Sequence, residues 1–405
     1  MNKLLIISFD LIRQGEVETS LAIGSILAFI KNDQEYGDNF SAYHLPINMF
    51  EVDKNDDVSF IEPHLNIFNF EKFEHIAISA YIWNEYLIND LMRLLRYKMG
   101  FKGEFILGGY QISYSNQPKL DYPEGDYFIN GYAEKSLLNI LQGQEKIQEV
   151  DFTQIPSPYL SGELLIKPNQ RMVRLETKRG CPYRCSFCAH RDLALNKVYK
   201  HKLDKVFEEL SLFKEKGVGK INILDPTFNM GLEYMEVMKE MDRIGLSSLV
   251  SVQTRLEMVN KDFLDACEKL NFNLEFGLQT AILAESKVIR RANKPERIKK
   301  IMKELNEREI SYEISLIYGL PTQTLESFKY SIDFVKEHGC KEITAWPLML
   351  LKGTELHDQK KEFGLIEEGI DDWNIPLVTE SNSYSKREWL EMRAIASQLL
   401  PNTRI

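Results

Sequence analysis

Short apolar runs alternate with longer amphipathic stretches through the first 150 residues. Four compact apolar runs, each followed by polar residues or glycine, are predicted to be buried strands: 4–8, 76–80, 105–107 and 127–129. Amphipathic stretches between and after them predict helices at 18–30, at 87–97 and from Ser136. The stretch 41–75 contains Pro46 and Pro63, and we expect it to be rich in loops. This alternation predicts a parallel sheet with helices on both faces and a ligand edge at the carboxyl ends of its strands.

The same alternation starts again after residues 151–170, a proline-containing stretch that we interpret as a linker. The predicted strands of this second region are 172–177, 220–225, 248–254, 272–278, 312–318 and 342–348. The predicted helices between them are 202–216, 232–244, 260–269, 295–309 and 325–338. Six such steps predict a partial (β/α)6 barrel over 171–356, with chemistry where the strands end. Residues 357–405 are predicted to be a helical extension.

Composition and charge narrow the class of protein. Of the 405 residues, 44% are hydrophobic and 27% are charged, the balance of a soluble globular protein. The formal net charge is −10, and an acidic surface repels phosphate backbones, which argues against general nucleic-acid binding. No apolar run is long enough for a membrane-spanning helix, and the first apolar run resembles a strand more than a signal peptide. We therefore expect a cytoplasmic protein.

Three of the five cysteines fall within eight positions, directly after a predicted strand. Cys181, Cys185 and Cys188 have the spacing C-x3-C-x2-C. Thiolates are the ligands of iron–sulfur clusters, and a four-iron cluster with only three of them keeps one iron open for a substrate or cofactor. The alternative is a zinc site completed by His190, which would make the protein a non-enzymatic metal-binding module. Zinc loops usually include a second, distant cysteine pair, and the sequence has none.

The cysteine loop resembles the signature of the radical S-adenosylmethionine (radical SAM) superfamily, and the resemblance covers 171–356. It implies that Cys181, Cys185 and Cys188 hold a [4Fe–4S] cluster whose open iron chelates the amino and carboxylate groups of SAM. One electron, from a partner such as flavodoxin or ferredoxin, would then release a 5′-deoxyadenosyl radical that takes a hydrogen atom from the substrate. The aromatic residue before the third cysteine, Phe187, is implied to lie beside the adenine.

The resemblance implies further SAM contacts at the ends of the next two strands. Asp225 and Thr227 occupy the position of the family's amino-group motif, although they depart from its usual Gly-Gly-Glu. Both side chains can accept hydrogen bonds from an ammonium group, but they are equally suited to a helix N-cap. Arg255 is able to pair with the SAM carboxylate; a surface salt bridge is the alternative.

Two later strand ends are also similar to the family. Glu275 and Gln279 match a polar segment near the SAM ribose and methionyl group. An unpartnered buried polar group costs roughly 1–3 kcal/mol, so a buried strand has little structural reason to carry them. Gly319 and Pro321 resemble a Gly-x-Pro turn that lets the backbone approach the adenine; an ordinary strand-to-helix turn is the alternative.

The N-terminal region, 1–150, looks like the Rossmann-like, cobalamin-binding domain of one group within this superfamily. The resemblance rests on 78–84, on Gly108–Gly109 and on 131–134, which stands where the group usually has Gly-Glu-Gly-Glu. The D-x-H-x-x-G pattern that supplies a histidine ligand to cobalt in other proteins is absent, as it is in many members of the group. Trp83 could cover a corrin face or belong to the core. The two alternatives for this domain are that it binds cobalamin or that it is an empty relic of such a site.

These features together predict an α/β enzyme of two domains that cleaves SAM reductively. Our first hypothesis is cobalamin-assisted methylation of a carbon atom in a natural-product intermediate or a peptide. The alternative is a cobalamin-independent radical dehydration, epimerisation or rearrangement. Cys267 and Cys340 are predicted to lie away from the radical, which argues against an auxiliary cluster. Residues 1–150 contain no cysteine, which excludes a methylthiotransferase-like cluster there.

Overall fold

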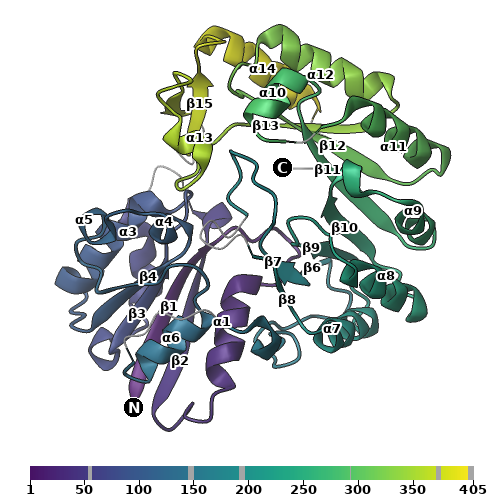
Figure 1. Ribbon diagram of the computed structural model, residues 1–405. Coiled ribbons are helices and arrows are strands. Elements are labelled where there is room, and N and C mark those ends of the chain that lie inside the picture. The colour runs from purple at the N-terminus through teal and green to yellow at the C-terminus, as the bar shows by residue number, and fades with distance from the viewer. Residues whose placement is uncertain (53–56, 145–149, 191–196, 292, 371–374, 400–405) are drawn as a thin grey trace. The chain divides into compact units, whose positions relative to one another are not determined.

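The computed structural model describes residues 1–52, 57–144, 150–190, 197–291, 293–370 and 375–399. The chain divides into two compact units, Met1–Gln170 and Arg171–Ile405. Each unit is built around one parallel sheet (Figure 1). Within the described residues, no helix combines the length and the apolar character needed to cross a membrane.

The first unit contains a five-stranded sheet in the order β2-β1-β3-β4-β5. Every neighbouring pair of strands is parallel. The strands are β1 (Asn2–Asp10), β2 (Phe40–Asn48), β3 (His75–Ser79), β4 (Glu104–Gly108) and β5 (Tyr127–Phe128). The three middle strands are almost wholly apolar because helices cover both of their faces. The predicted Rossmann-like parallel sheet is therefore confirmed.

Helices of the first unit lie on both sides of this sheet. Helices α1 (Leu21–Lys31) and α6 (Glu134–Leu141) pack together over one face, where their apolar side chains share a core with β1 and β2. Helix α3 (Glu85–Arg93) lies on the other side and continues as a π-helical turn, Leu94–Lys98 (Figure 1). The shorter helices are α2 (Glu62–Leu65), α4 (Tyr110–Ser113) and α5 (Pro118–Asp121).

The edge strand β2 corrects the prediction that 41–75 is mainly loop. Phe40, Leu45 and Ile47 of this strand are buried against the core. Pro46 pairs in register with Ser8 of β1 and lacks the N–H that a second neighbour would need. It is tolerated because β2 lies at the sheet edge, where one side of the strand needs no partner.

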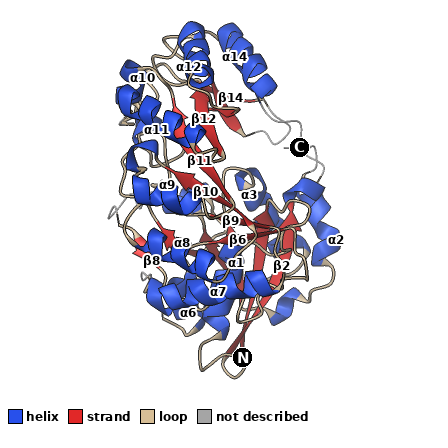
Figure 2. Ribbon diagram, turned by 90° about the vertical axis from the view of Figure 1, so that its right-hand side faces the viewer, coloured by secondary structure: helices blue, strands red, loops and turns tan. Residues whose placement is uncertain are grey.

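The second unit contains a six-stranded parallel sheet in the order β13-β12-β11-β10-β9-β6. Its strands are β6 (Met172–Leu175), β9 (Lys220–Ile223), β10 (Leu249–Thr254), β11 (Phe272–Gln279), β12 (Tyr312–Tyr318) and β13 (Glu342–Pro347). The connecting helices are α7 (Leu203–Glu215), α8 (Glu233–Arg243), α9 (Lys261–Cys267), α11 (Pro295–Glu307) and α12 (Leu325–Glu337) (Figure 2). The predicted partial (β/α)6 barrel is confirmed, with one additional helix, α10 (Leu283–Val288), between β11 and α11.

The two faces of this sheet differ in chemistry, as β11 shows. Phe272, Leu274 and Phe276 are buried on the face that the helices cover. Glu275 and Gln279 alternate with them and are only partly buried on the inner face. The inner face at the carboxyl ends of the strands is therefore the polar face of the barrel.

The prediction that 357–405 is a helical extension is incomplete, because the structure also has two strands there. Two antiparallel strands, β14 (Ile366–Gly369) and β15 (Pro376–Glu380), precede helix α14 (Lys386–Leu399). Trp389 of α14 is fully buried, with its ring centroid 5.7 Å from that of Tyr318 at the end of β12. The remaining short elements are β7 (Lys178–Arg179), β8 (Tyr199–Lys200), α13 (Glu355–Asp358) and 3-10 turns at Met49–Glu51, Val58–Ile61, Phe70–Lys72, Phe152–Gln154 and Leu256–Met258.

Candidate active site

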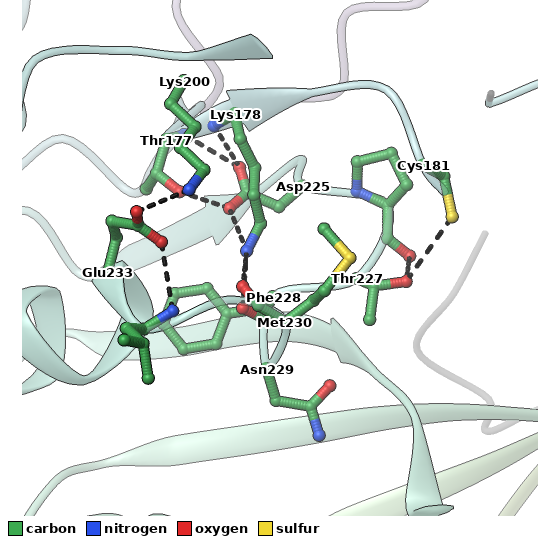
Figure 3. A network of polar contacts seen from close by, with 12 residues as sticks. Thr177, Lys178, Cys181, Lys200, Asp225, Thr227, Phe228, Asn229, Met230 and Glu233 are labelled. Atoms are coloured by element: carbon green, nitrogen blue, oxygen red, sulfur yellow. Dashed lines mark hydrogen bonds and ion pairs between the residues drawn. The ribbon is translucent and has the colours of Figure 1, made fainter. Parts of the chain in front are cut away.

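The start of the cysteine loop is held by a buried carboxylate from the neighbouring strand end. Asp225, which follows β9, accepts hydrogen bonds from the backbone N–H groups of Thr177 (2.8 Å) and Lys178 (3.1 Å). Its second oxygen accepts a hydrogen bond from the Thr177 hydroxyl. Figure 3 shows these groups converging on Asp225. Asp225 is not an N-cap, because α8 begins only after Leu232.

Lys178 completes this network from the other side. Its ammonium group donates to the carbonyl oxygens of Phe228 and Met230, each at 2.8 Å, and lies 4.0 Å from the Asp225 carboxylate. Both side chains are buried, Asp225 completely. Burial raises the pKa of Asp225 to about 6, although Lys178 and the hydrogen bonds from Thr177 oppose that rise. The network binds the loop after β9 to the first residues of the cysteine loop (Figure 3).

The ends of β9 and β10 are joined in the same way. Asn229 is buried and exchanges two 3.0 Å hydrogen bonds with the backbone of Arg255. The Arg255 guanidinium pairs with Glu257 and lies 3.7 Å from the ring centroid of Tyr183 in the cysteine loop. Arg255 is only 4% exposed, so this is a buried ion pair rather than the surface salt bridge of the alternative prediction. The cation–π contact between Arg255 and Tyr183 links the end of β10 to the cysteine loop.

The three cysteine thiols lie close enough to affect one another. Cys181 and Cys185 are buried, and Cys188 is partly buried. Burial, with smaller contributions from the neighbouring Cys185 and Cys181, raises the pKa of Cys188 to about 11. Such a thiol becomes a thiolate ligand when a strongly cationic centre binds to it. Thr227 approaches this group, with its hydroxyl 3.9 Å from the Cys181 sulfur.

The second half of the loop is fixed by elements from the far side of the barrel. Ser186 donates its N–H to the carbonyl of Ile289 (3.1 Å), just after α10, and accepts from the N–H of Leu356 (2.9 Å). Phe187 packs against an apolar cluster that contains Leu320 and Leu348, at the ends of β12 and β13. The structure thus brings Phe187 and the Gly319–Pro321 turn into one neighbourhood, as the prediction of a shared ligand requires.

The end of β11 holds a buried polar atom that has no hydrogen-bond partner among the described residues. Gln279 has φ +72°, and a register shift between Gly277 and Gln279 turns its amide back over Gly277, where any larger side chain would clash with it. The Oε1 atom of Gln279 is buried and accepts no hydrogen bond among the described residues. Glu275, four residues earlier in β11, accepts a 3.0 Å hydrogen bond from the Ser251 hydroxyl. An orphaned acceptor beside a glycine cradle on the polar face fits a bound polar cofactor such as SAM.

Arg291 is a residue of this site that our sequence reasoning missed. Its guanidinium Nη1 lies 3.8 Å from the Cys185 sulfur. Its Nε is buried without a hydrogen-bond acceptor among the described residues. The only signal in the sequence is a pair of adjacent arginines after α10, which says nothing about which of the two points inward.

The Gly319 turn is built for tight packing. Gly319 has φ +87°, and a β-carbon there would lie 3.1 Å from the carbonyl oxygen of Val378. Its N–H donates to Gln323 (2.7 Å) and its carbonyl accepts from the Tyr384 hydroxyl (2.7 Å). The backbone groups of Gly319 are therefore already bonded within the chain, and Pro321, two residues later, is also buried.

The remaining two cysteines lie elsewhere. Cys267 is in the last turn of α9, and Cys340 precedes β13, at the opposite end of the sheet from the cysteine loop. Both are buried, and burial raises the pKa of Cys267 to about 12 and that of Cys340 to about 11. Such thiols are unreactive.

Across the described parts of the chain, no group of three His, Cys, Asp or Glu side chains is arranged to hold a single metal ion.

The carboxyl edge of the first unit's sheet carries an aromatic pair. Trp83 stacks on Tyr81, with ring centroids 4.5 Å apart and planes at 7°, and donates to the carbonyl of Phe9 at 3.0 Å. Gly109 has φ +92° and lies so close to the Ala80 backbone that a side chain would clash. The edge therefore presents a fixed, flat aromatic surface beside a narrow glycine turn.

Comparisons with known proteins find a family match within the barrel unit. Residues 175–335 match the family model described as the radical SAM superfamily. Two curated relatives are a 2-(S-pantetheinyl)-carbapenam-3-carboxylate methyltransferase from Streptantibioticus cattleyicolor, 25% identical over 269 residues, and the cobalamin-dependent radical SAM methyltransferase TokK from Streptomyces tokunonensis, 26% identical over 269 residues. Each match covers 58% of this chain but 39% of the relative, so the matched region is about two-fifths of the relatives' length.

The fold extends the likeness over both units. The radical SAM methyltransferase TsrM from Kitasatospora setae, solved with cobalamin and a [4Fe–4S] cluster bound, superposes with a TM-score of 0.70. At 13% identity the match covers 99% of this chain and 90% of TsrM. Residues 175–335 therefore resemble the radical SAM superfamily in sequence, and the chain as a whole has the fold of TsrM.

Proposed function

We propose that this chain is a cobalamin-dependent radical SAM methyltransferase that methylates an unactivated carbon of a natural-product intermediate or a peptide. The observation that carries the proposal is the presence, in one chain, of a three-cysteine loop at the end of β6 and a cobalamin-binding-like sheet. The cobalamin-dependent relative TokK, itself a methyltransferase, supports the same reaction class.

The residues of the barrel divide into those that would hold cofactors and those that hold the site together. Cys181, Cys185 and Cys188 would bind the cluster. Four polar or aromatic residues are the proposed SAM contacts: Phe187, Thr227, Glu275 and Gln279. Asp225, Arg255 and Gly319 would act through the loops that they fix, because their polar groups already bond within the chain. Pro321 would line the adenine side.

The first unit would supply the second cofactor site. The stacked Trp83–Tyr81 pair offers a flat apolar surface to a corrin, and Gly108–Gly109 leaves room for it at the end of β4. No described histidine stands in a D-x-H-x-x-G pattern, so the chain would not supply the usual imidazole ligand to cobalt. When bound, the cluster with SAM supplies a hydrogen-abstracting radical and cobalamin supplies the methyl group.

The reaction also needs an electron and a suitable compartment. A reducing partner such as flavodoxin or ferredoxin would supply the electron. Three neighbouring thiols that must remain reduced fit the cytoplasm, where disulfides are rare.

The test is anaerobic reconstitution with iron and sulfide, with and without hydroxocobalamin, followed by an iron count and visible spectra. About four irons per chain are expected, together with retained corrinoid bands. Iron without corrinoid would contradict the cobalamin-dependent reaction and favour the cobalamin-independent alternative. Zinc without iron would contradict the radical reaction altogether. Incubation with SAM and dithionite should then release 5′-deoxyadenosine.

A further inference from the structure

Two adjacent arginines after α10 point in different directions. Arg290 has φ +51°, a left-handed conformation that reverses the direction of the chain. Its exposed guanidinium pairs with Glu355 at 2.6 Å. The guanidinium of Arg291 instead lies 3.8 Å from the sulfur of Cys185, which is a proposed ligand of the cluster. The two adjacent guanidinium groups therefore differ in position: that of Arg291 lies beside the cysteine loop, and that of Arg290 is exposed.

The segment that carries Arg291 is fixed at several points. The N–H of Arg291 donates to the carbonyl of Ser286 at 2.8 Å. The carbonyl of Ile289 accepts from Ser186, which lies next to Cys185. The amide of Asn293 donates to the carbonyls of Leu278 and Thr280, both at 2.9 Å, at the end of β11. The guanidinium is therefore held against the cysteine loop by the backbone on both sides of it.

In the described parts of the chain, the charge of Arg291 has no acidic partner. Among the described residues, no carboxylate forms an ion pair with Arg291, and its Nε, which is buried, has no hydrogen-bond acceptor. Arg255, the other guanidinium near the loop, is already paired with Glu257. Arg291 is therefore a guanidinium beside Cys185 that pairs with no carboxylate among the described residues.

We propose that Arg291 sets the reduction potential of the bound cluster through Cys185. This inference rests on the proposed function. Reduction adds one electron, and so one negative charge, to the cluster and its thiolates. A guanidinium that stays protonated and donates toward a ligand sulfur stabilises the more negative state more strongly than the oxidised one. Arg291 therefore makes the cluster easier to reduce, and it acts as a positioning charge rather than as a group that reacts.

The test compares three variants in reconstituted, SAM-free protein by redox titration with dithionite, monitored by electron paramagnetic resonance of the reduced cluster. Arg291→Gln removes the charge and Arg291→Lys keeps it without the guanidinium fork. Arg290→Gln is the matched control, because it removes an identical charge one residue away. Omitting SAM separates an effect on the cluster from an effect on SAM binding.

We expect the ratio of reduced to oxidised cluster at a fixed potential to fall roughly tenfold in Arg291→Gln, the equivalent of one charge-assisted hydrogen bond. It should fall less in Arg291→Lys and stay unchanged in Arg290→Gln. If Arg291→Gln fails to bind iron, the potential of Arg291→Lys decides the question. Wild-type potentials in the Arg291 variants that bind iron would overturn this inference while leaving the proposed function intact. A wild-type chain that assembles no four-iron cluster would overturn both.

Discussion

At the scale of single residues, the ion pair of Asp225 and Lys178 is the most costly feature of the site to disturb. Asp225→Asn removes the negative charge that pairs with the buried Lys178 ammonium. It also replaces one of the carboxylate oxygens with an NH2 group, which cannot accept the hydrogen bonds that Thr177 and Lys178 donate in the wild type. Breaking one side of a buried pair costs about 3–5 kcal/mol. We expect a loss of that size in the unfolding free energy of the barrel unit, measured by urea denaturation of the cluster-free protein.

The exposed Asp242→Asn, at the end of α8, is the control for this substitution and should change stability by less than about 0.5 kcal/mol. Equal losses in the two variants would show that the buried pair contributes nothing. Iron binding should fall with Asp225→Asn, because the start of the cysteine loop would no longer be held.

A partly buried histidine makes the first unit sensitive to acid. Burial, with a smaller contribution from the charge of Lys31, lowers the pKa of His44 in β2 to about 4, from 6.5. Between these two values the unfolded chain binds the proton and the folded chain does not, so stability is present above pH 6.5 and is lost as pH falls toward 4. Chemical denaturation at pH 7 and pH 5 should show this loss. His44→Gln should weaken the pH dependence, and His64→Gln, at an exposed position, should leave it unchanged.

At the scale of elements, the turn after β12 depends on a glycine. Gly319→Ala would place a β-carbon 3.1 Å from the Val378 carbonyl and 3.2 Å from the Tyr384 hydroxyl, at a φ of +87°. Gly245→Ala is the matched control, since it has φ +62° and its only close neighbour is the flexible end of Lys214 at 3.8 Å. Both variants bear the left-handed strain of about 1–2 kcal/mol, and only the first also bears the steric clash. Thermal unfolding should therefore rank Gly319→Ala clearly below Gly245→Ala; an equal loss would contradict the packing argument.

The sequence predicted the elements of the barrel better than the partners of its polar residues. Periodicity identified all six strands because each has an apolar face that must be buried. It missed β2, whose Pro46 is unfavourable in a strand unless the strand lies at an edge, and edge position follows only from the whole topology. The partners of Asp225 lie 47 and 48 residues away, and the inward direction of Arg291 depends on the left-handed turn at Arg290. Such contacts are set by three-dimensional packing and not by local pattern.

At the scale of the whole molecule, the two units should lose their cofactors independently. Trp83→Ala removes one of the two stacked rings, Trp83 and Tyr81, in the first unit. We expect reconstituted Trp83→Ala to retain several-fold less corrinoid than the wild type, because the flat surface that would contact the macrocycle is gone. Its iron content should stay at about four per chain, since Cys181, Cys185 and Cys188 belong to the other unit.

Tyr97→Ala is the control, an aromatic truncation at an exposed position of the same unit that should keep both cofactors. Cys188→Ala should give the converse result, with iron lost and corrinoid retained, whereas Cys267→Ala should lose neither because that thiol is buried in α9. Iron counts and corrinoid absorbance on the same samples measure both quantities at once. Loss of corrinoid from Cys188→Ala, or of iron from Trp83→Ala, would contradict this prediction and mean that the two cofactor sites depend on each other for assembly.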